Sequence, residues 1–230
     1  MTLILAIPAK DGIVMASDGQ LTAGKIRSTG EKIRKLNDRC LWAASGELAL
    51  IQRVEERLTS LPEVSVQQIR DQISNIVRDC VTKLIDLDFR TRFLPQQPDL
   101  LLGLHPGDFV FAEYAGAPEI LHVLTNGISE WIHGRPFASG SGDQFAYALL
   151  QKYQDQLARI EVAKATLLAY KVMEEAIAVG AYGLGPPIHM WEMTSGGITK
   201  LDEAQIASLE DASRTLREAE VQLLIQGPNA

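Results

Sequence analysis

Two short and almost wholly apolar segments at the start of the chain constrain its fold most strongly. Residues 3–9 (LILAIPA) and 12–17 (GIVMAS) are joined by the sequence AKDG, whose Asp-Gly pair favours a tight hairpin turn. An antiparallel strand that packs on one face only alternates apolar and polar residues, and neither segment does so. We therefore predict a β-hairpin within a sheet that is covered on both faces.

The order of the remaining segments predicts the layers of the fold. Further strands are predicted over residues 32–36, 39–45, 99–105, 108–115, 119–124, 130–138, 188–193 and 197–201. Two helices are predicted after Gly46 and from the capping-box pair Ser65 and Gln68, and two more over residues 143–157 and 161–179. This order favours an α+β fold, a four-layer αββα sandwich in which helices cover two mostly antiparallel sheets. We expect one domain over residues 1–201 and a C-terminal amphipathic helical tail over residues 202–230.

Composition excludes several classes of function. The net charge of −7 argues against a nucleic-acid-binding surface, because phosphate contacts need clustered lysine and arginine. No apolar run reaches the roughly 18 residues of a membrane span, and the first strand lacks the basic start of a signal peptide. Cys40 and Cys80 form no CxxC pair, so we expect buried, reduced thiols and a cytoplasmic protein. The histidines show no metal-like spacing, and we expect neither a metal nor an organic cofactor.

The second residue carries the candidate chemistry. Once Met1 is removed, Thr2 would hold both a hydroxyl nucleophile and an α-amine that titrates near 8. Such a residue contains its own general base, a variant of the serine–histidine arrangement. Threonine at position 2 is weak evidence on its own.

Two charged residues add weight to this interpretation. Asp18 ends the second apolar strand, so the hairpin would return it to a point beside Thr2. Lys32 begins a further strand, and an ammonium group near the hydroxyl would lower the pKa of that hydroxyl, with a carboxylate holding the lysine in place. Each residue alone has a simpler interpretation, Asp18 as a turn residue before Gly19 and Lys32 as a solvated strand end.

The segment TLILAIPAKDGIVMASDGQLTAG, followed by GEKIRKL, resembles the start of proteasome β-type subunits and most closely the bacterial HslV peptidases. These are threonine peptidases with the N-terminal-nucleophile (Ntn) hydrolase fold. The resemblance implies that Thr2 is the nucleophile, Asp18 the family's aspartate and Lys32 its lysine. The interval from Asp18 to the lysine is two residues short, and Lys32 is chosen over Lys35 by its G-x-K-apolar setting.

Two later stretches extend the resemblance, which covers residues 2–201 and leaves the tail outside. WAASGE is similar to the stretch that forms the oxyanion hole, and Ala43 takes a position that is usually glycine. ASGSGD is similar to the family's GSG, which implies a proton-relay role for Ser141. Helix capping by Ser141, or a backbone nest at its flanking glycines, is the alternative. The family's Asp and Ser after the fourth helix are absent from VGAYGLGPPIHM.

The resemblance implies a threonine-type endopeptidase that acts on peptides or unfolded proteins within a homo-oligomeric ring, with an ATPase unfoldase as a possible partner. Gln20, Glu31 and Leu41 are expected to line its substrate pocket. Two alternatives stay open. One is a catalytically inactive scaffold, favoured by the absent Asp and Ser. The other is an amidase or transpeptidase of the same fold that acts on a specific small substrate.

Overall fold

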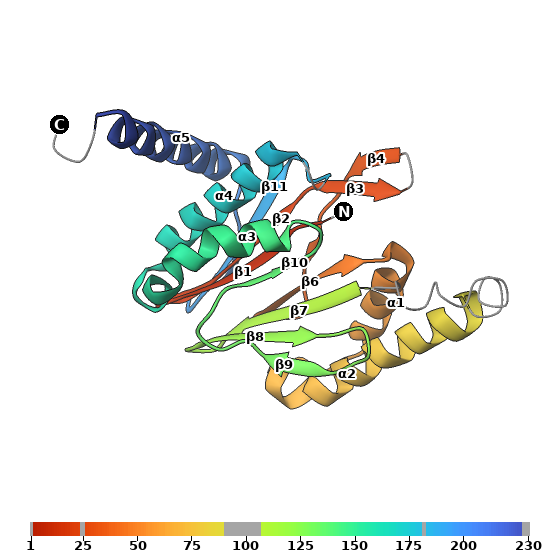
Figure 1. Cartoon of the computed structure of the whole chain (residues 1–230). Helices are drawn as coiled ribbons and strands as arrows, with labels where there is room; N and C mark the ends of the chain where they lie inside the picture. The colour runs from red at the N-terminus through yellow and green to blue at the C-terminus, as the bar shows by residue number, and fades with distance from the viewer. Residues whose placement is uncertain (1, 24–25, 90–106, 181–182, 227–230) are drawn as a thin grey trace.

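Two five-stranded antiparallel sheets stacked face to face form the centre of the molecule, as the computed structural model shows (Figure 1). The structure describes residues 2–23, 26–89, 107–180 and 183–226. The first sheet has the order β10 (Phe137–Ser139), β1 (Ile4–Ala9), β2 (Gly12–Asp18), β11 (Ile188–Thr194), β12 (Gly197–Lys200). The second has the order β5 (Ile33–Lys35), β6 (Cys40–Gly46), β7 (Gly107–Tyr114), β8 (Pro118–Val123), β9 (Ser129–Trp131).

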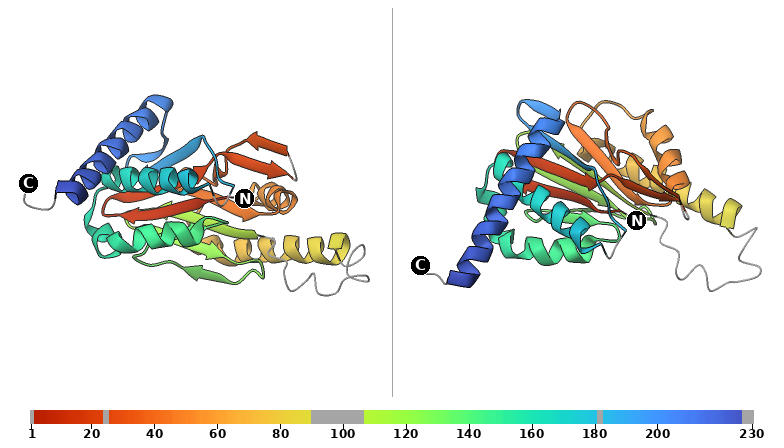
Figure 2. Two further views of the ribbon diagram at one scale, coloured as in Figure 1. Left: turned by 45° about the horizontal axis from the view of Figure 1, so that its top comes forward. Right: turned by 90° about the horizontal axis from the view of Figure 1, so that it is seen from above.

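Helices cover the outer face of each sheet, which completes the predicted four-layer sandwich (Figure 2). On the second sheet lie α1 (Leu48–Leu58) and α2 (Val66–Lys83), which continues as a π-helix over Leu84–Phe89. On the first sheet lie α3 (Asp143–Leu150), a 3-10 helix (Gln151–Arg159) and α4 (Val162–Val179). The fold class expected from the sequence is confirmed.

Alternate residues of the first strand pack into different layers, which explains why the strand is apolar throughout. Leu3, Leu5 and Ile7 belong to the cluster formed with α3 and α4, whereas Ile4 and Ala6 belong to the cluster between the sheets. Burial on both faces removes the need for polar residues at alternate positions. A third apolar cluster lies between the second sheet and helices α1 and α2.

Some predicted element boundaries differ from the structure. The predicted strand over residues 130–138 is divided into β9 and β10, because Gly134 has φ +62° and Pro136 cannot donate to a ladder. The third helix becomes a 3-10 helix after Leu150. The polar hairpin of β3 (Gln20–Ala23) and β4 (Ile26–Thr29) was not predicted. The predicted strand over residues 99–105 lies outside the described residues.

Other local predictions are confirmed. Ser65 and Gln68 form the capping box of α2, and Gly180 ends α4 in the left-handed conformation with φ +66°. Cys40 and Cys80 are buried, free thiols. None of the described helices is long and apolar enough to cross a membrane.

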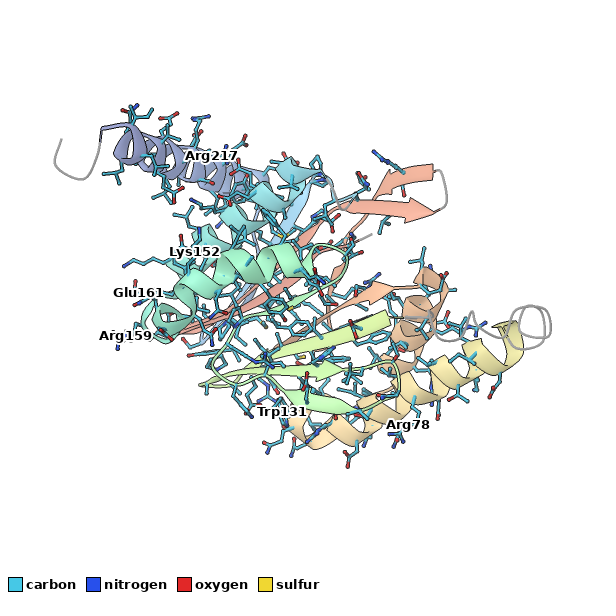
Figure 3. All side chains as sticks on the ribbon, in the orientation of Figure 1. Arg78, Trp131, Lys152, Arg159, Glu161 and Arg217 are labelled. Carbon is cyan, nitrogen blue, oxygen red and sulfur yellow. The ribbon has the colours of Figure 1, made fainter. Side chains whose placement is uncertain are left out.

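Within the described residues, the predicted C-terminal tail forms one helix, α5 (Glu203–Gln226), and its first half packs against α4. Ile206 and Leu209 contact the apolar cluster beneath α4, and buried Ser213 donates a hydrogen bond to Glu174. Arg217, labelled in Figure 3, also binds Glu174. The end of α5 projects from the body of the molecule (Figures 1 and 2). A domain boundary at residue 201 stays a prediction.

Candidate active site

The first hairpin brings Asp18 back to the start of the chain. Ile4 is paired with Ser17 in the antiparallel ladder, so Asp18 lies beside Leu3. The Leu3 amide donates to Asp18 Oδ1 at 2.9 Å, and the Asp18 amide donates to the Leu3 carbonyl at 3.2 Å. The register therefore fixes the Asp18 carboxylate one residue away from Thr2.

Asp18 forms a buried ion pair with Lys32. Lys32 Nζ lies 2.6 Å from Asp18 Oδ1, and the two side chains are 4% and 0% exposed. Burial lowers the pKa of Lys32, while the Asp18 carboxylate opposes that shift. The alternative lysine, Lys35, instead lies over the Trp191 ring with its Nζ 6.0 Å from the ring centroid. The structure therefore pairs the lysine at position 32 with Asp18.

Backbone groups complete the surroundings of Asp18. Its Oδ2 accepts hydrogen bonds from the amides of Gln20 at 3.2 Å and Gly185 at 3.4 Å. The Gln20 side-chain amide donates to the Gly183 carbonyl at 2.6 Å. The loop after α4, which lacks the family's Asp and Ser, thus meets the site through main-chain groups. No side-chain pattern in the sequence encodes this contact, so it was not predicted.

Ser141 lies against Thr2 from the loop between β10 and α3. The Thr2 nitrogen donates to Ser141 Oγ at 3.2 Å, and Ser141 Oγ donates to the Thr2 carbonyl at 3.4 Å. Gly140 makes this approach possible, because its φ is +106° and a Cβ there would overlap the Thr2 carbonyl oxygen. The structure therefore brings Thr2, Asp18, Lys32 and Ser141 to one end of the two sheets.

A cavity of about 330 Å³ opens beside Thr2. Its lining residues come from the ends of β6 and β10 and the starts of β7 and α3: Thr2, Ser45, Gly46, Gly107, Asp108, Gly140, Ser141 and Asp143. A larger cavity of about 820 Å³ lies between α4, α5, β11 and β12, and Thr2 is not among its lining residues. The smaller cavity is therefore the candidate substrate site.

The structure does not bring Ala43 to this cavity. Ala43 is fully buried between the sheets and is paired with both Ile33 and Val110 within the ladder. The strand runs three residues further, and Gly46 ends it beside the cavity with φ +129°. The apolar run in the sequence gives no sign of where the strand leaves the sheet, and the predicted residue, Ala43, therefore lies inside the strand. The first glycine after the run was the available signal.

The expected substrate-pocket residues lie elsewhere. Leu41 is fully buried in the cluster between the sheets, so its expected contact with substrate is wrong. Glu31 accepts hydrogen bonds from Trp191 Nε1 at 3.0 Å and Lys200 Nζ at 2.8 Å. Among the described residues, no group of three or more His, Cys, Asp or Glu side chains is placed to hold a metal ion.

Comparison with known protein families identifies the family of the chain. The family model described as proteasome subunit matches residues 2–185. The chain belongs to the proteasome subunit family. It is 28% identical to a proteasome subunit beta from Nanoarchaeum equitans over 206 residues, covering 87% of this chain and 97% of that protein. It is 24% identical to a proteasome subunit beta from Methanococcus maripaludis over 208 residues, covering 89% of each.

Solved structures show the same fold. Anbu (ancestral beta-subunit) from Yersinia bercovieri has a TM-score of 0.74 at 13% identity, over 99% of this chain and 98% of that chain. The Anbu (Gly-1) mutant from Hyphomicrobium sp. strain MC1 has a TM-score of 0.69 at 17% identity, over 96% and 97%. At these identities the likeness establishes the fold of this proteasome β-type chain. It is the Ntn-hydrolase fold.

Proposed function

We propose that the chain is a threonine-type endopeptidase whose nucleophile is the Thr2 hydroxyl, exposed after removal of Met1. One observation carries the proposal: the Thr2 nitrogen donates a hydrogen bond to Ser141 Oγ beside the cavity. The next residue, Leu3, is hydrogen-bonded to Asp18 of the buried Asp18–Lys32 pair. A free amine at this nitrogen would have a hydroxyl partner on one side and a fixed cation nearby. This combination suits proton transfer from the Thr2 side chain.

In the proposed reaction, the Thr2 amine accepts the hydroxyl proton as the oxygen attacks a peptide carbonyl. Lys32 stabilises the negative charge that develops on the Thr2 oxygen, and Asp18 holds the lysine in place. Ser141 passes protons between the amine and the leaving group. The acyl-enzyme ester is then hydrolysed by a water molecule that uses the same amine as its base.

We propose the Gly46 amide, in place of Ala43, as the donor to the oxyanion. Gly46 lines the cavity together with Thr2, and its positive φ is a conformation that favours glycine. A backbone N–H aimed at a developing oxyanion typically lowers the barrier by about 3 kcal/mol. Ala43 is paired with neighbouring strands on both sides, whereas Gly46 is paired, among the described residues, only with Gly107 of β7, which favours Gly46 for this role.

The proposal includes assembly into a homo-oligomeric ring, as in other proteasome-family proteins. The end of α5 carries exposed apolar residues, with Leu223 62%, Leu224 85% and Ile225 73% exposed, which would favour contact between copies. Sedimentation velocity on the full chain and on Leu224→Glu tests this part. A monomeric full chain would contradict it. An ATPase unfoldase remains a prediction from the resemblance.

Intact-mass measurement before and after treatment with a β-lactone tests the nucleophile. The expected masses are that of a chain without Met1 and, after treatment, that of its single adduct. Thr2→Ala should take up no label and cleave no fluorogenic peptide, whereas Thr2→Ser should keep a measurable fraction of both activities. Thr59→Ala is the control, because it removes an exposed threonine hydroxyl at the end of α1, away from the cavity, and should keep both activities.

The outcomes separate the alternatives. A chain that keeps Met1 has no free Thr2 amine, which would favour the inactive scaffold. A chain that is labelled but does not cleave unfolded proteins or most peptides would favour an amidase or transpeptidase acting on a specific small substrate. Labelling of Thr2→Ala would show that the nucleophile lies elsewhere.

A further inference from the structure

A chain of polar side chains runs through the second sheet from its outer edge to the Thr2 cavity, and the proposed mechanism leaves it unused. His122 on β8 is at its centre. Its Nδ1 lies 3.1 Å from Glu130 Oε1 on β9, and its Nε2 lies 3.3 Å from Asp108 Oδ1 on β7. Asp108 is one of the residues that line the cavity.

The chain continues from Asp108 into both walls of the cavity. Ser139 Oγ on β10 donates to Asp108 Oδ2 at 3.4 Å, and Ser139 Oγ lies 2.8 Å from Ser45 Oγ on β6. Since Ser139 gives its proton to the carboxylate, Ser45 must donate to Ser139. The hydrogen bond between Ser45 and Ser139 joins β6 of the second sheet to β10 of the first sheet. Ser45 directly precedes Gly46, and Ser139 directly precedes Gly140.

The two contacts of His122 require a particular protonation state. Both ring nitrogens face carboxylate oxygens, which accept hydrogen bonds and cannot donate them when ionised. A neutral imidazole has one N–H, so it would satisfy one carboxylate and turn a lone pair toward the other. Only the imidazolium donates to both. The geometry therefore selects the charged ring.

The surroundings of His122 agree with a positive charge. Its side chain is 10% exposed and lies on the face of β8 that meets the first sheet. The groups around it there are the Asp108 and Glu130 carboxylates, the Phe137 ring at 4.7 Å, and the apolar strand β1. Burial lowers the pKa of His122, but the hydrogen bonds and charges of Asp108 and Glu130 outweigh it, so the pKa is raised.

We propose that His122 is a positioning residue for the peptidase reaction. Its imidazolium donates hydrogen bonds to two carboxylates and so holds Asp108 in place. Through Ser139 and Ser45, it then fixes the two walls of the Thr2 cavity relative to each other. This inference rests on the proposed function. Ser45 supplies the carbonyl of the peptide unit whose N–H belongs to Gly46, so its anchorage orients the proposed oxyanion donor. Ser139 likewise precedes the Gly140–Ser141 segment that contacts Thr2. His122 touches neither substrate nor nucleophile in this scheme.

The sign of the pH effect follows from the charged form. As the pH rises through the pKa of His122, the ring loses its charge and one of its two donors, so its hold on Asp108 weakens and the link between the walls of the cavity loosens. Activity should therefore fall at alkaline pH. This loss opposes the gain in activity that comes from deprotonation of the Thr2 amine. The defect should lower kcat more than it raises KM, because an oxyanion donor acts in the transition state.

The decisive test compares kcat across pH 5.5–9.5 in the full chain, Glu130→Gln and His122→Gln, with a fluorogenic peptide. Glu130 is half exposed, with 52% of its side chain accessible, so its variant should fold. Removing this carboxylate takes away one charge that raises the pKa of His122, so the alkaline limb should move to lower pH while kcat at pH 6 stays within about twofold. In His122→Gln the limb should disappear and kcat should fall about tenfold. His133→Gln, at an exposed histidine, is the control and should keep the wild-type profile.

A second measurement does not depend on turnover. The chain has four histidines, and His122→Gln assigns the His122 signal in a ¹³C-histidine NMR titration. The His122 signal should titrate above the ordinary histidine range and shift down in Glu130→Gln. If the full chain neither hydrolyses peptide nor takes up β-lactone at any pH, the proposed function fails. If the full chain is active but Glu130→Gln keeps its alkaline limb, or if His122 titrates below the ordinary range, the inference about His122 alone is overturned.

Discussion

Lys32 and Asp18 form an ion pair that is almost completely removed from solvent, with 2.6 Å between Nζ and Oδ1. Removing one partner of such a pair leaves an uncompensated buried charge, which costs about 3–5 kcal/mol of stability. We therefore expect Lys32→Met to lower the free energy of unfolding by that amount, and to abolish labelling of Thr2. Urea unfolding followed by circular dichroism measures the first effect, and intact mass after β-lactone treatment measures the second.

Two further variants separate the stability of this pair from its chemistry. The double variant Asp18→Asn/Lys32→Met should recover part of the lost stability, because no buried charge remains, yet should stay unlabelled. Lys35→Met, at an exposed lysine at the end of β5 and three residues after Lys32, should change neither property. A double variant that regained labelling would remove Lys32 from the mechanism.

Gly140→Ala should displace Thr2 from its place beside Ser141. The change combines backbone strain at φ +106° with overlap between the new Cβ and the Thr2 carbonyl. Gly197 is a matched control, because its φ is +107° and no atom lies within 4 Å of a Cβ built there. Gly197→Ala should cost about 1–3 kcal/mol from strain alone and keep its rate of labelling by the β-lactone. Gly140→Ala should lose at least tenfold in that rate, and equal rates in the two variants would contradict the proposed contact.

The sequence predicts those parts of the molecule that rest on local patterns. Apolar runs predict β1 and β2, and the turn between them places Asp18 beside the chain start, because antiparallel register follows from turn length. The capping box of α2 and the glycine at the end of α4 are local signals of the same kind.

Long-range features of the site were beyond such patterns. Ser45 and Ser139 are 94 residues apart in the chain, and their contact depends on how the two sheets stack. His122 in EILHVL reads as an apolar strand position until β7 and β9 supply carboxylates on both sides. Gly46 was overlooked although it is the first glycine after the apolar run, because the run itself does not show which residue of β6 reaches the cavity. These features follow from tertiary packing, which a single sequence does not encode locally.

Deleting residues 202–230 should destabilise the chain, although these residues were predicted to form a tail outside the domain. Ile206 and Leu209 pack against the apolar cluster of α4, and Ser213 is buried against Glu174. Their loss should cost at least about 2 kcal/mol, because burial of one large apolar side chain stabilises by about 1.5–3 kcal/mol. Thermal unfolding measures the effect. A chain that ends at Glu220 keeps these contacts within the chain and should lose less stability than the chain that ends at residue 201; equal loss in both truncations would contradict this division of α5.

Glu113 provides a pH-dependent test of the fold, away from the active site. Its side chain on β7 is 1% exposed, and its Oε2 accepts a hydrogen bond from the Val66 amide at 2.7 Å, at the start of α2. Burial raises the pKa of Glu113, while the Val66 amide and the Arg39 charge oppose the shift. Between the unfolded pKa and the higher folded pKa, the folded state binds more protons than the unfolded state, so this group reduces stability as the pH rises through that window.

Glu113→Gln should therefore gain stability relative to the full chain as the pH is raised from 4 to 7.5. The glutamine oxygen can still accept from the Val66 amide, while the penalty for a buried carboxylate is removed. Urea unfolding at a series of pH values gives the difference in free energy of unfolding between the two proteins. Glu56→Gln, at an exposed glutamate on α1, is the control and should give a nearly constant difference. The prediction is wrong if this difference for Glu113→Gln does not change with pH, or if it favours the full chain at high pH. Either result would show that the Glu113 carboxylate is stabilised where it lies.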